Sequence, residues 1–250
     1  MTTIDNAWAV PQIADRRFGA ALFDLDGVLT PTAEVHMKAW NRMFTDYFTA
    51  RGVTPAYTDD DYFAYVDGKP RYDGVRACLA SRGVVLPEGT PEDAAGTETV
   101  CGIGNTKNDA FEAILHDEGV APYPGSVALL DHLEALGTAM AVVSSSRNAP
   151  AVLKAAGIAH RFEIVVDGNV VATEGIRGKP APDMFELAAQ RLGVADADSV
   201  VVEDALSGVA AGAAGDFGLV VGVDRGAGAD ALRAGGADIV VEDLAELVGE

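Results

Sequence analysis

The 250-residue sequence has few cysteines, no long hydrophobic run and no recognisable signal sequence. Its two cysteines, Cys78 and Cys101, form neither a metal-binding spacing nor a disulfide framework, which indicates a reducing compartment. No apolar stretch approaches the roughly 18 residues of a membrane helix. Residues 1–20 lack the charged and then apolar pattern of a signal peptide. We therefore expect a cytoplasmic protein with no membrane partner.

Basic residues are also scarce. The chain has 18 Lys and Arg against 38 Asp and Glu, which gives a formal net charge of −20. Such a charge repels nucleic acid and anionic lipid at long range, so we expect no nucleic-acid partner. If the substrate is itself an anion, the few basic side chains must be concentrated where it binds.

Several familiar catalytic motifs are absent from the sequence. There is no Gly-x-Ser-x-Gly turn and no Walker loop. The four histidines, His36, His116, His132 and His160, form no His-Glu-x-x-His pattern. These absences exclude the hydrolase, nucleotide-binding and zinc sites that depend on those motifs.

What remains is the composition of a folded globular protein, with 49% apolar and 22% charged residues. Short apolar runs recur along the chain without alternation, as is typical of parallel strands covered on both faces. They are residues 20–23, 139–143, 163–166, 199–202, 217–221 and 238–241. Helical spacing lies between them at residues 126–136, 148–156 and 183–192. The pattern predicts an α/β fold with a doubly wound, Rossmann-like parallel sheet.

One long stretch interrupts this alternation. Residues 33–117 contain helical patterns at 34–49, 72–81 and 107–116 and a Pro-, Gly- and acid-rich loop at 86–98, but no convincing strand. We interpret the stretch as a helical cap inserted after the first strand. The predicted domains are therefore an α/β core of residues 1–31 and 119–250 and a cap of residues 32–118.

Polar residues follow the predicted strands where each strand ends. They are Asp24-Leu25-Asp26-Gly27, Ser144-Ser145-Ser146-Arg147-Asn148 and Glu203-Asp204, with Lys179 in a nearby loop. Singly, such residues are most often turn formers, helix caps or solvated side chains. In an open parallel sheet, however, they meet at one edge. Two carboxylates 4 Å apart repel by about 4 kcal/mol at an effective dielectric constant of 20, so we expect a cation there. Oxygen ligands without His or Cys favour Mg²⁺.

These segments resemble the four motifs of the haloacid dehalogenase superfamily, in the same order. The resemblance runs over residues 18–241, and the insertion is similar to the cap of the β-phosphoglucomutase-like subfamily. It implies that Asp24 is a nucleophile that becomes phosphorylated and that Asp26 is the general acid and base. It also implies that Mg²⁺ is held by Asp24, the Asp26 backbone carbonyl, Glu203 and Asp204. Ser144, Ser145 and Lys179 would bind the phosphoryl oxygens.

The resemblance extends to residues that would hold the rest of a sugar phosphate. Arg71 would bind a distal phosphate, Lys107 would meet sugar hydroxyls, and Thr32 and His36 would set the protonation of Asp26. The further residues assigned to the distal phosphate are Ser146, Arg147 and Asn148. Two departures leave the sugar open: Pro31 stands where relatives commonly carry an acid, and residues 84–105 are longer than in compact relatives.

The sequence thus predicts a monomeric, Mg²⁺-dependent enzyme acting on a small sugar phosphate. The reaction we expect is interconversion of β-glucose 1-phosphate and glucose 6-phosphate through β-glucose 1,6-bisphosphate. A sugar-phosphate phosphatase on the same scaffold is the main alternative. Gly226-Ala227-Gly228-Ala229-Asp230-Ala231 formally fits a dinucleotide fingerprint, but the following helix is short and the sheet is incomplete for that role. An inactive interaction protein is disfavoured because both Asp24 and Asp26 are present.

Overall fold

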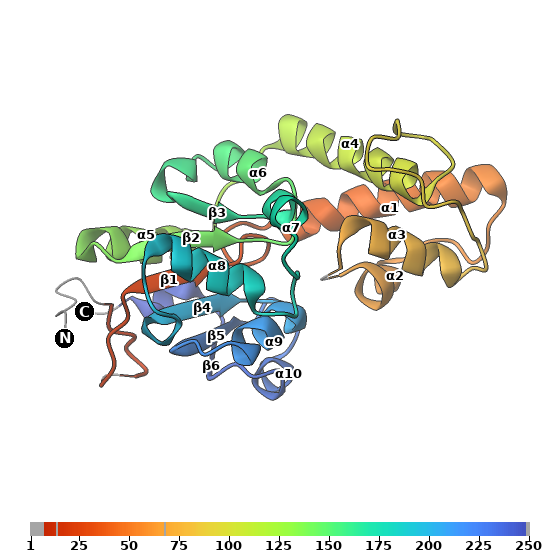
Figure 1. The fold of residues 1–250 in the computed structure, drawn as a ribbon. Coiled ribbons are helices and arrows are strands. Elements are labelled where there is room, and N and C mark those ends of the chain that lie inside the picture. Colours follow the sequence, from red (N-terminus) through yellow and green to blue (C-terminus); the bar gives the residue numbers. More distant parts are fainter. Residues whose placement is uncertain (1–7, 14, 68, 249–250) are drawn as a thin grey trace. The chain divides into compact units, whose positions relative to one another are not determined.

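The computed structural model describes residues 8–13, 15–67 and 69–248 (Figure 1). The chain divides into two compact units. Unit 1 consists of Met1–Pro31 and Ala121–Glu250, and unit 2 is Thr32–Val120. The first boundary is at the position predicted from the sequence. The second boundary lies two residues after its predicted position. Unit 2 thus interrupts unit 1 shortly after the first strand.

Unit 1 contains a six-stranded parallel sheet with strand order β3-β2-β1-β4-β5-β6. The strands are β1 (Ala20–Phe23), β2 (Ala139–Val143), β3 (Ile164–Val166), β4 (Ser199–Glu203), β5 (Leu219–Val223) and β6 (Ile239–Val241). Phe23 at the end of β1 is in register with Val142 of β2 and Val202 of β4. The carboxyl ends of these three strands therefore lie at one level of the sheet. The predicted α/β fold with a parallel sheet is confirmed.

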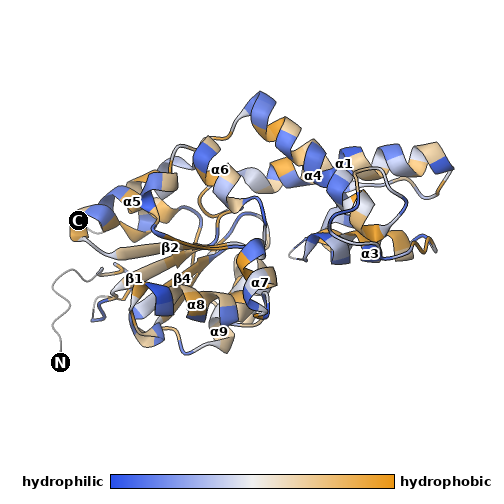
Figure 2. Cartoon of the chain, turned by 45° about the horizontal axis from the view of Figure 1, so that its top comes forward, coloured by the Kyte–Doolittle hydropathy of each residue, from blue (hydrophilic) through white to orange (hydrophobic). Residues whose placement is uncertain are grey.

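Helices cover both faces of this sheet, which explains why its strands are almost entirely apolar. Figure 2 shows α5 (Pro124–Leu136) and α6 (Ala149–Ala155) on one side, and α8 (Asp183–Leu192) and α9 (Leu206–Ala214) on the other. Met184 and Phe185 of α8 pack into the same buried cluster as Leu22 of β1 and Val201 of β4. All four residues of β1 are fully buried.

The predicted helices of unit 1 are present with small shifts at their ends. Pro124 starts α5, and Gly137 and Gly193 end α5 and α8 in the left-handed conformation. Two helices were not predicted, α7 (Gly168–Glu174) and α9, whereas the short helix expected next to the glycine-rich segment at 226–231 is present as α10 (Ala229–Ala234). The strand expected at 217–221 begins only at Leu219. The amide of Gly218 donates instead to the carbonyls of Asp196 and Ser199, before and at the start of β4.

Unit 2 is helical, as its sequence pattern predicts. Its helices are α1 (Thr32–Arg51), α2 (Asp59–Asp61), α3 (Arg71–Ala80) and α4 (Val100–Glu118), with a π-helical turn at Tyr62–Val66. Stacked aromatic rings fill the core, since Phe44 lies 5.5 Å from Trp40 and 5.1 Å from Tyr57 between ring centroids. Helix α4 begins seven residues before its predicted start, because the Thr99 side chain accepts a hydrogen bond from the Gly102 amide. The predicted loop at 86–98 has no helix or strand.

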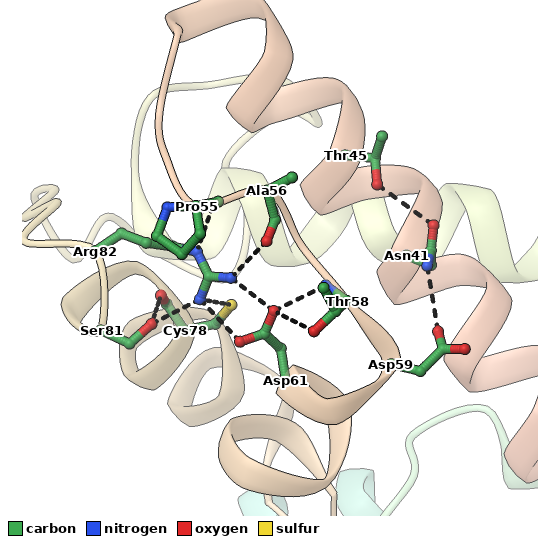
Figure 3. A network of polar contacts seen from close by, with 10 residues as sticks. All are labelled: Asn41, Thr45, Pro55, Ala56, Thr58, Asp59, Asp61, Cys78, Ser81 and Arg82. Carbon is green, nitrogen blue, oxygen red and sulfur yellow. Dashed lines mark hydrogen bonds and ion pairs between the residues drawn. The ribbon is translucent and has the colours of Figure 1, made fainter.

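A buried ion pair fixes the segment between α1 and α3 (Figure 3). Arg82 donates to Asp61 across 2.6 Å, and only 3% and 13% of their side chains are exposed. The same guanidinium donates to the carbonyls of Pro55 and Ala56. Burial opposes ionisation of Asp61, but hydrogen bonds from Arg82 and Thr58 outweigh it and lower the Asp61 pKa.

Candidate active site

Three acidic side chains meet at the carboxyl edge of the sheet in unit 1. Asp24 follows β1, Glu203 ends β4, and Asp204 comes next. One carboxylate oxygen of each lies within 4.8 Å of those of the other two. The alignment of β1 with β4 produces this convergence although the acids are about 180 residues apart in sequence.

Lys179 lies among these carboxylates. Its Nζ donates to Asp24 Oδ1 across 2.6 Å, to Glu203 Oε1 across 2.5 Å and to the Val143 carbonyl across 2.8 Å. Only 3% of the lysine side chain is exposed. Burial disfavours the ammonium form, but Asp24 and Glu203 more than compensate and raise the Lys179 pKa. Lys179 is therefore a buried cation bridging two acids.

Two glycines make room for the acids. A Cβ at Gly27 would overlap the Asp204 carboxylate, and Gly27 also has φ +89°, which favours glycine. A Cβ at Gly208 in α9 would overlap the Glu203 carboxylate. Glu203 is fixed further by the Ala205 amide, which donates to its Oε2 across 3.0 Å. The positions of these carboxylates therefore require glycine at 27 and 208.

The donor set fits a hard divalent cation. Asp24, Glu203 and Asp204 offer carboxylate oxygens within reach of one another, and the two glycines leave the space that those carboxylates occupy. Oxygen ligands of this kind suit Mg²⁺ or Ca²⁺ rather than a softer transition metal. The ligand expected from the Asp26 backbone carbonyl stays a prediction.

Asp26 lies beside the loop that follows β2. Ser144 is fully buried, and its hydroxyl donates to Asp26 Oδ2 across 3.4 Å. The Ser146 amide donates to the Ser144 hydroxyl, and the Asn148 amide donates to the Ser146 hydroxyl, each across 3.1 Å. Within the same loop, Ser145 and Arg147 are exposed. The predicted serine segment therefore forms an ordered turn next to the second aspartate.

Three consecutive carbonyls of the loop after Asp24 accept hydrogen bonds from residues outside the loop. Arg225 Nε donates to Gly27 O across 3.0 Å, and Ser126 Oγ donates to Val28 O across 2.7 Å. The Tyr123 amide donates to Leu29 O across 3.0 Å. The Arg225 guanidinium also lies 4.1 Å from the Tyr123 ring centre. The contacts of Arg225 and Ser126 could not be predicted from the sequence, because no local motif marks a side chain that bonds to a distant carbonyl.

The other predicted residues belong to unit 2. Thr32 is buried at the start of α1, and His36 follows one turn later. His36 stacks on Phe111, and Lys107 Nζ lies 2.5 Å from His36 Nδ1. Burial and the nearby cations lower the His36 pKa. Because an ammonium only donates, Nδ1 is the acceptor, and the proton of the neutral ring is on Nε2.

Arg71 is also part of unit 2, at the first position of α3. Its Nη2 donates to Asn108 Oδ1 across 2.7 Å, and its Nη1 donates to Asn105 Oδ1 across 3.4 Å. The contact of Asn105 with Arg71 could not be predicted from the sequence, because the other partners of Asn105 lie in an irregular loop.

Unit 1 therefore contains the groups for chemistry at a phosphorus centre. The Asp24 carboxylate can act as a nucleophile, and the adjacent ammonium of Lys179 can offset the charge of anionic oxygens. Asp26 is a second acid two residues away that can transfer protons.

Comparison with known proteins agrees with this chemistry. Residues 18–216 match the haloacid dehalogenase-like hydrolase family. The chain is 47% identical to the β-phosphoglucomutase of Mycobacterium tuberculosis (strain CDC 1551 / Oshkosh) over 95% of this chain and 97% of that protein. It is 32% identical to hexitol phosphatase A of Escherichia coli (strain K12), over 90% of this chain and 91% of the relative.

Solved structures of similar proteins have the same fold. CbbY from Rhodobacter sphaeroides, in complex with phosphate, superposes with a TM-score of 0.72 at 25% identity, covering 92% of this chain and 96% of CbbY. A β-phosphoglucomutase from Clostridium difficile also has a TM-score of 0.72 at 25% identity, covering 92% and 93%. Because the family match spans most of the sequence and close relatives align almost end to end, the chain belongs to the haloacid dehalogenase-like hydrolase family, as its motifs predicted.

Proposed function

We propose that the protein is a phosphoglucomutase that interconverts β-glucose 1-phosphate and glucose 6-phosphate through β-glucose 1,6-bisphosphate. The observation that carries this proposal is the 47% identity to the M. tuberculosis β-phosphoglucomutase over nearly the whole chain. The β-phosphoglucomutase of Bacillus subtilis (strain 168) adds support at 33% identity over 92% of both chains.

Asp24 attacks the phosphorus in this scheme. A bond forms between its carboxylate oxygen and the phosphorus of the 1-phosphate of β-glucose 1,6-bisphosphate. The bond from that phosphorus to the sugar oxygen breaks, and Asp26 gives its proton to that oxygen, which releases glucose 6-phosphate. In the return step Asp26 takes a proton from the 6-hydroxyl of β-glucose 1-phosphate. This hydroxyl attacks the phosphorus on Asp24, the bond from phosphorus to the carboxylate breaks, and the bisphosphate is formed again. The contact of Asp26 with Ser144 supports a role for Asp26 next to the nucleophile.

Lys179 holds the phosphoryl group during both steps. Its ammonium already bonds to the nucleophile and is fixed by Glu203, so it needs little rearrangement to bind phosphoryl oxygens. Ser144 and Ser145 complete these contacts.

We assign the metal site to Asp24, the Asp26 backbone carbonyl, Glu203 and Asp204. Bound Mg²⁺ would neutralise negative charge on the transferring group. The clustering of three of these acids supports the assignment.

Unit 2 supplies groups for the rest of the substrate. Arg71 binds the second phosphate, because a guanidinium matches two phosphate oxygens at once. Ser146, Arg147 and Asn148 of unit 1 share this role. In unit 2, Lys107 binds sugar hydroxyls, and Thr32 and His36 tune Asp26. A related CbbY variant from R. sphaeroides has been solved with xylulose-1,5-bisphosphate, so a relative does accept a sugar bisphosphate.

A sugar-phosphate phosphatase is the second candidate, because hexitol phosphatase A aligns over 90% of this chain. Phosphorus NMR of the protein with Mg²⁺, β-glucose 1-phosphate and a trace of bisphosphate separates the two. A mutase produces a glucose 6-phosphate signal with little inorganic phosphate. Stoichiometric inorganic phosphate without glucose 6-phosphate would overturn the proposal.

A further inference from the structure

The guanidinium of Arg71 is held by two neutral amides one turn apart on α4. Asn108 accepts from Nη2 across 2.7 Å, and Asn105 accepts from Nη1 across 3.4 Å. Amide oxygens orient a guanidinium without bringing a negative charge to it. This type of support suits an arginine that has to bind an anion.

Asn105 is itself held by the long loop that precedes α4. Its Nδ2 donates to the carbonyl of Pro91 across 3.1 Å and to that of Asp93 across 2.8 Å. Because both bonds need the NH₂ group, they fix which end of the amide faces the loop. The Asn105 oxygen is thereby directed to Arg71 and to the Tyr72 hydroxyl, which donates to it across 3.0 Å.

The loop is firmly attached to α4 around this point. Thr99 donates to Asp93 Oδ2 across 2.5 Å and caps the helix at Gly102. Further along, the Gly96 amide donates to the Thr106 hydroxyl across 2.8 Å. The loop therefore presents the two carbonyls to Asn105 from a fixed backbone, and Asn105 connects that backbone to Arg71.

Gly104 shows that close packing is required here. A Cβ at this position would lie 2.7 Å from Tyr72 Cδ1 and 3.3 Å from Arg71 Cδ, so a larger residue would displace both side chains. Glycine inside a helix is less favourable than alanine. The chain nevertheless has glycine here in the second turn of α4, where it allows Tyr72 and Arg71 to approach Asn105.

We propose that Asn105 is a positioning residue that holds Arg71 in the orientation that binds the second phosphate of the sugar bisphosphate. Through Asn105, the loop at residues 84–99 sets this orientation and with it the selectivity for doubly phosphorylated sugars. This inference rests on the proposed function, in which Arg71 contacts the distal phosphate.

A double-mutant cycle tests the proposal. Arg71→Ala, Asn105→Ala and the double variant are assayed for mutase turnover and for hydrolysis of a small aryl phosphate, which has no second phosphate. Asn105→Ala should lower mutase kcat/KM about tenfold, mainly through KM, as expected for one hydrogen bond to a charged group. Aryl phosphate hydrolysis should change less than about twofold, and the double variant should be no worse than Arg71→Ala.

Two further variants complete the design. Asn105→Asp keeps the side-chain shape but places a carboxylate against Arg71, so it should raise the mutase KM more than Asn105→Ala does. Asn41→Ala removes an asparagine of α1 that bonds to Asp59, and it should leave both activities unchanged. Asn105→Asp also provides the readout if Asn105→Ala does not fold.

The outcomes separate this inference from the proposed function. If Arg71→Ala impairs the mutase but Asn105→Ala acts independently of it, or impairs both substrates equally, the positioning role is overturned and the proposed function stands. A wild-type KM for Asn105→Asp would likewise overturn it. If Arg71→Ala itself leaves the mutase unchanged, the distal-phosphate role of Arg71 fails, and the inference fails with it.

Discussion

At the scale of single residues, Lys179 is the most consequential side chain of unit 1. It is the buried cation between Asp24 and Glu203, at 2.6 and 2.5 Å. Removing one member of such a group leaves buried charge without compensation, which is strongly destabilising.

We therefore expect Lys179→Met, measured without divalent cations, to lower the free energy of unfolding by about 3–5 kcal/mol. Added Mg²⁺ should recover part of this loss by replacing the missing positive charge. Urea denaturation with and without Mg²⁺ measures both effects. The control is Lys154→Met at an exposed position of α6, which should change stability by less than about 0.5 kcal/mol. Equal effects of the two substitutions would contradict this account.

The sequence indicated some functional residues and not others. Asp24, Glu203 and Asp204 each follow an apolar strand directly, so their shared edge could be predicted from the parallel sheet alone. Asn105 and Arg225 act on carbonyls of distant segments. Nothing in the sequence on either side of these two residues indicates such a partner.

At the scale of elements, the loop after β1 depends on neighbours that are far away in sequence. Arg225 Nε is the donor to Gly27 O, and Nη1 donates to Glu242 O across 3.0 Å. One side chain thus connects the loop after Asp24 to the segment after β6.

Arg225→Leu should lower the free energy of unfolding by about 1–3 kcal/mol, because it leaves the buried Gly27 carbonyl without this donor. Thermal or urea unfolding measures the loss. Arg233→Leu is the matched control, since its ion pair with Asp230 is exposed and such pairs contribute at most about 1 kcal/mol. An Arg225 variant as stable as the control would show that the carbonyl contact is unimportant.

The Arg82 to Asp61 pair in Figure 3 predicts a pH dependence of stability. The pKa of Asp61 is lowered from its ordinary value of 3.8, so the folded state binds its proton more weakly than the unfolded state does. The stabilisation is complete above pH 3.8 and is lost as the pH falls through the folded-state pKa.

Asp61→Asn should accordingly cost about 3 kcal/mol at neutral pH, as expected when a buried pair is broken. The difference from the unsubstituted protein should shrink as the solution is acidified below pH 3.8. Urea unfolding across this range measures it. A difference that stays constant with pH would mean that the carboxylate charge contributes nothing.

The elements themselves were predicted unevenly. Helix α8 has the predicted bounds, because its apolar spacing and terminal glycine agree. The first two turns of α4 were missed, because Cys101-Gly102-Ile103-Gly104 has low helix propensity and is helical through its cap and packing. Helix α10 is short and buries only Leu232, so its sequence pattern is weak.

At the scale of the whole molecule, the helical insertion was predictable because strand patterns stop after the first strand and resume about 115 residues later. Apolar runs of similar composition do not specify their neighbours by themselves, but the observed strand order is that of the doubly wound, Rossmann-like sheet that we expected. No helix in the described part of the chain is long and apolar enough to span a membrane. The acidic composition remains consistent with the use of a few clustered basic residues around an anionic substrate.

The most direct measurement locates the phosphoryl group on the protein during turnover. The enzyme is mixed with Mg²⁺ and β-glucose 1,6-bisphosphate, quenched in acid and mapped by peptide mass spectrometry. The account predicts phosphate on the peptide that contains Asp24, and its loss, together with the loss of turnover, in Asp24→Asn. Phosphate on a different residue, or turnover that survives the Asp24→Asn substitution, would contradict it.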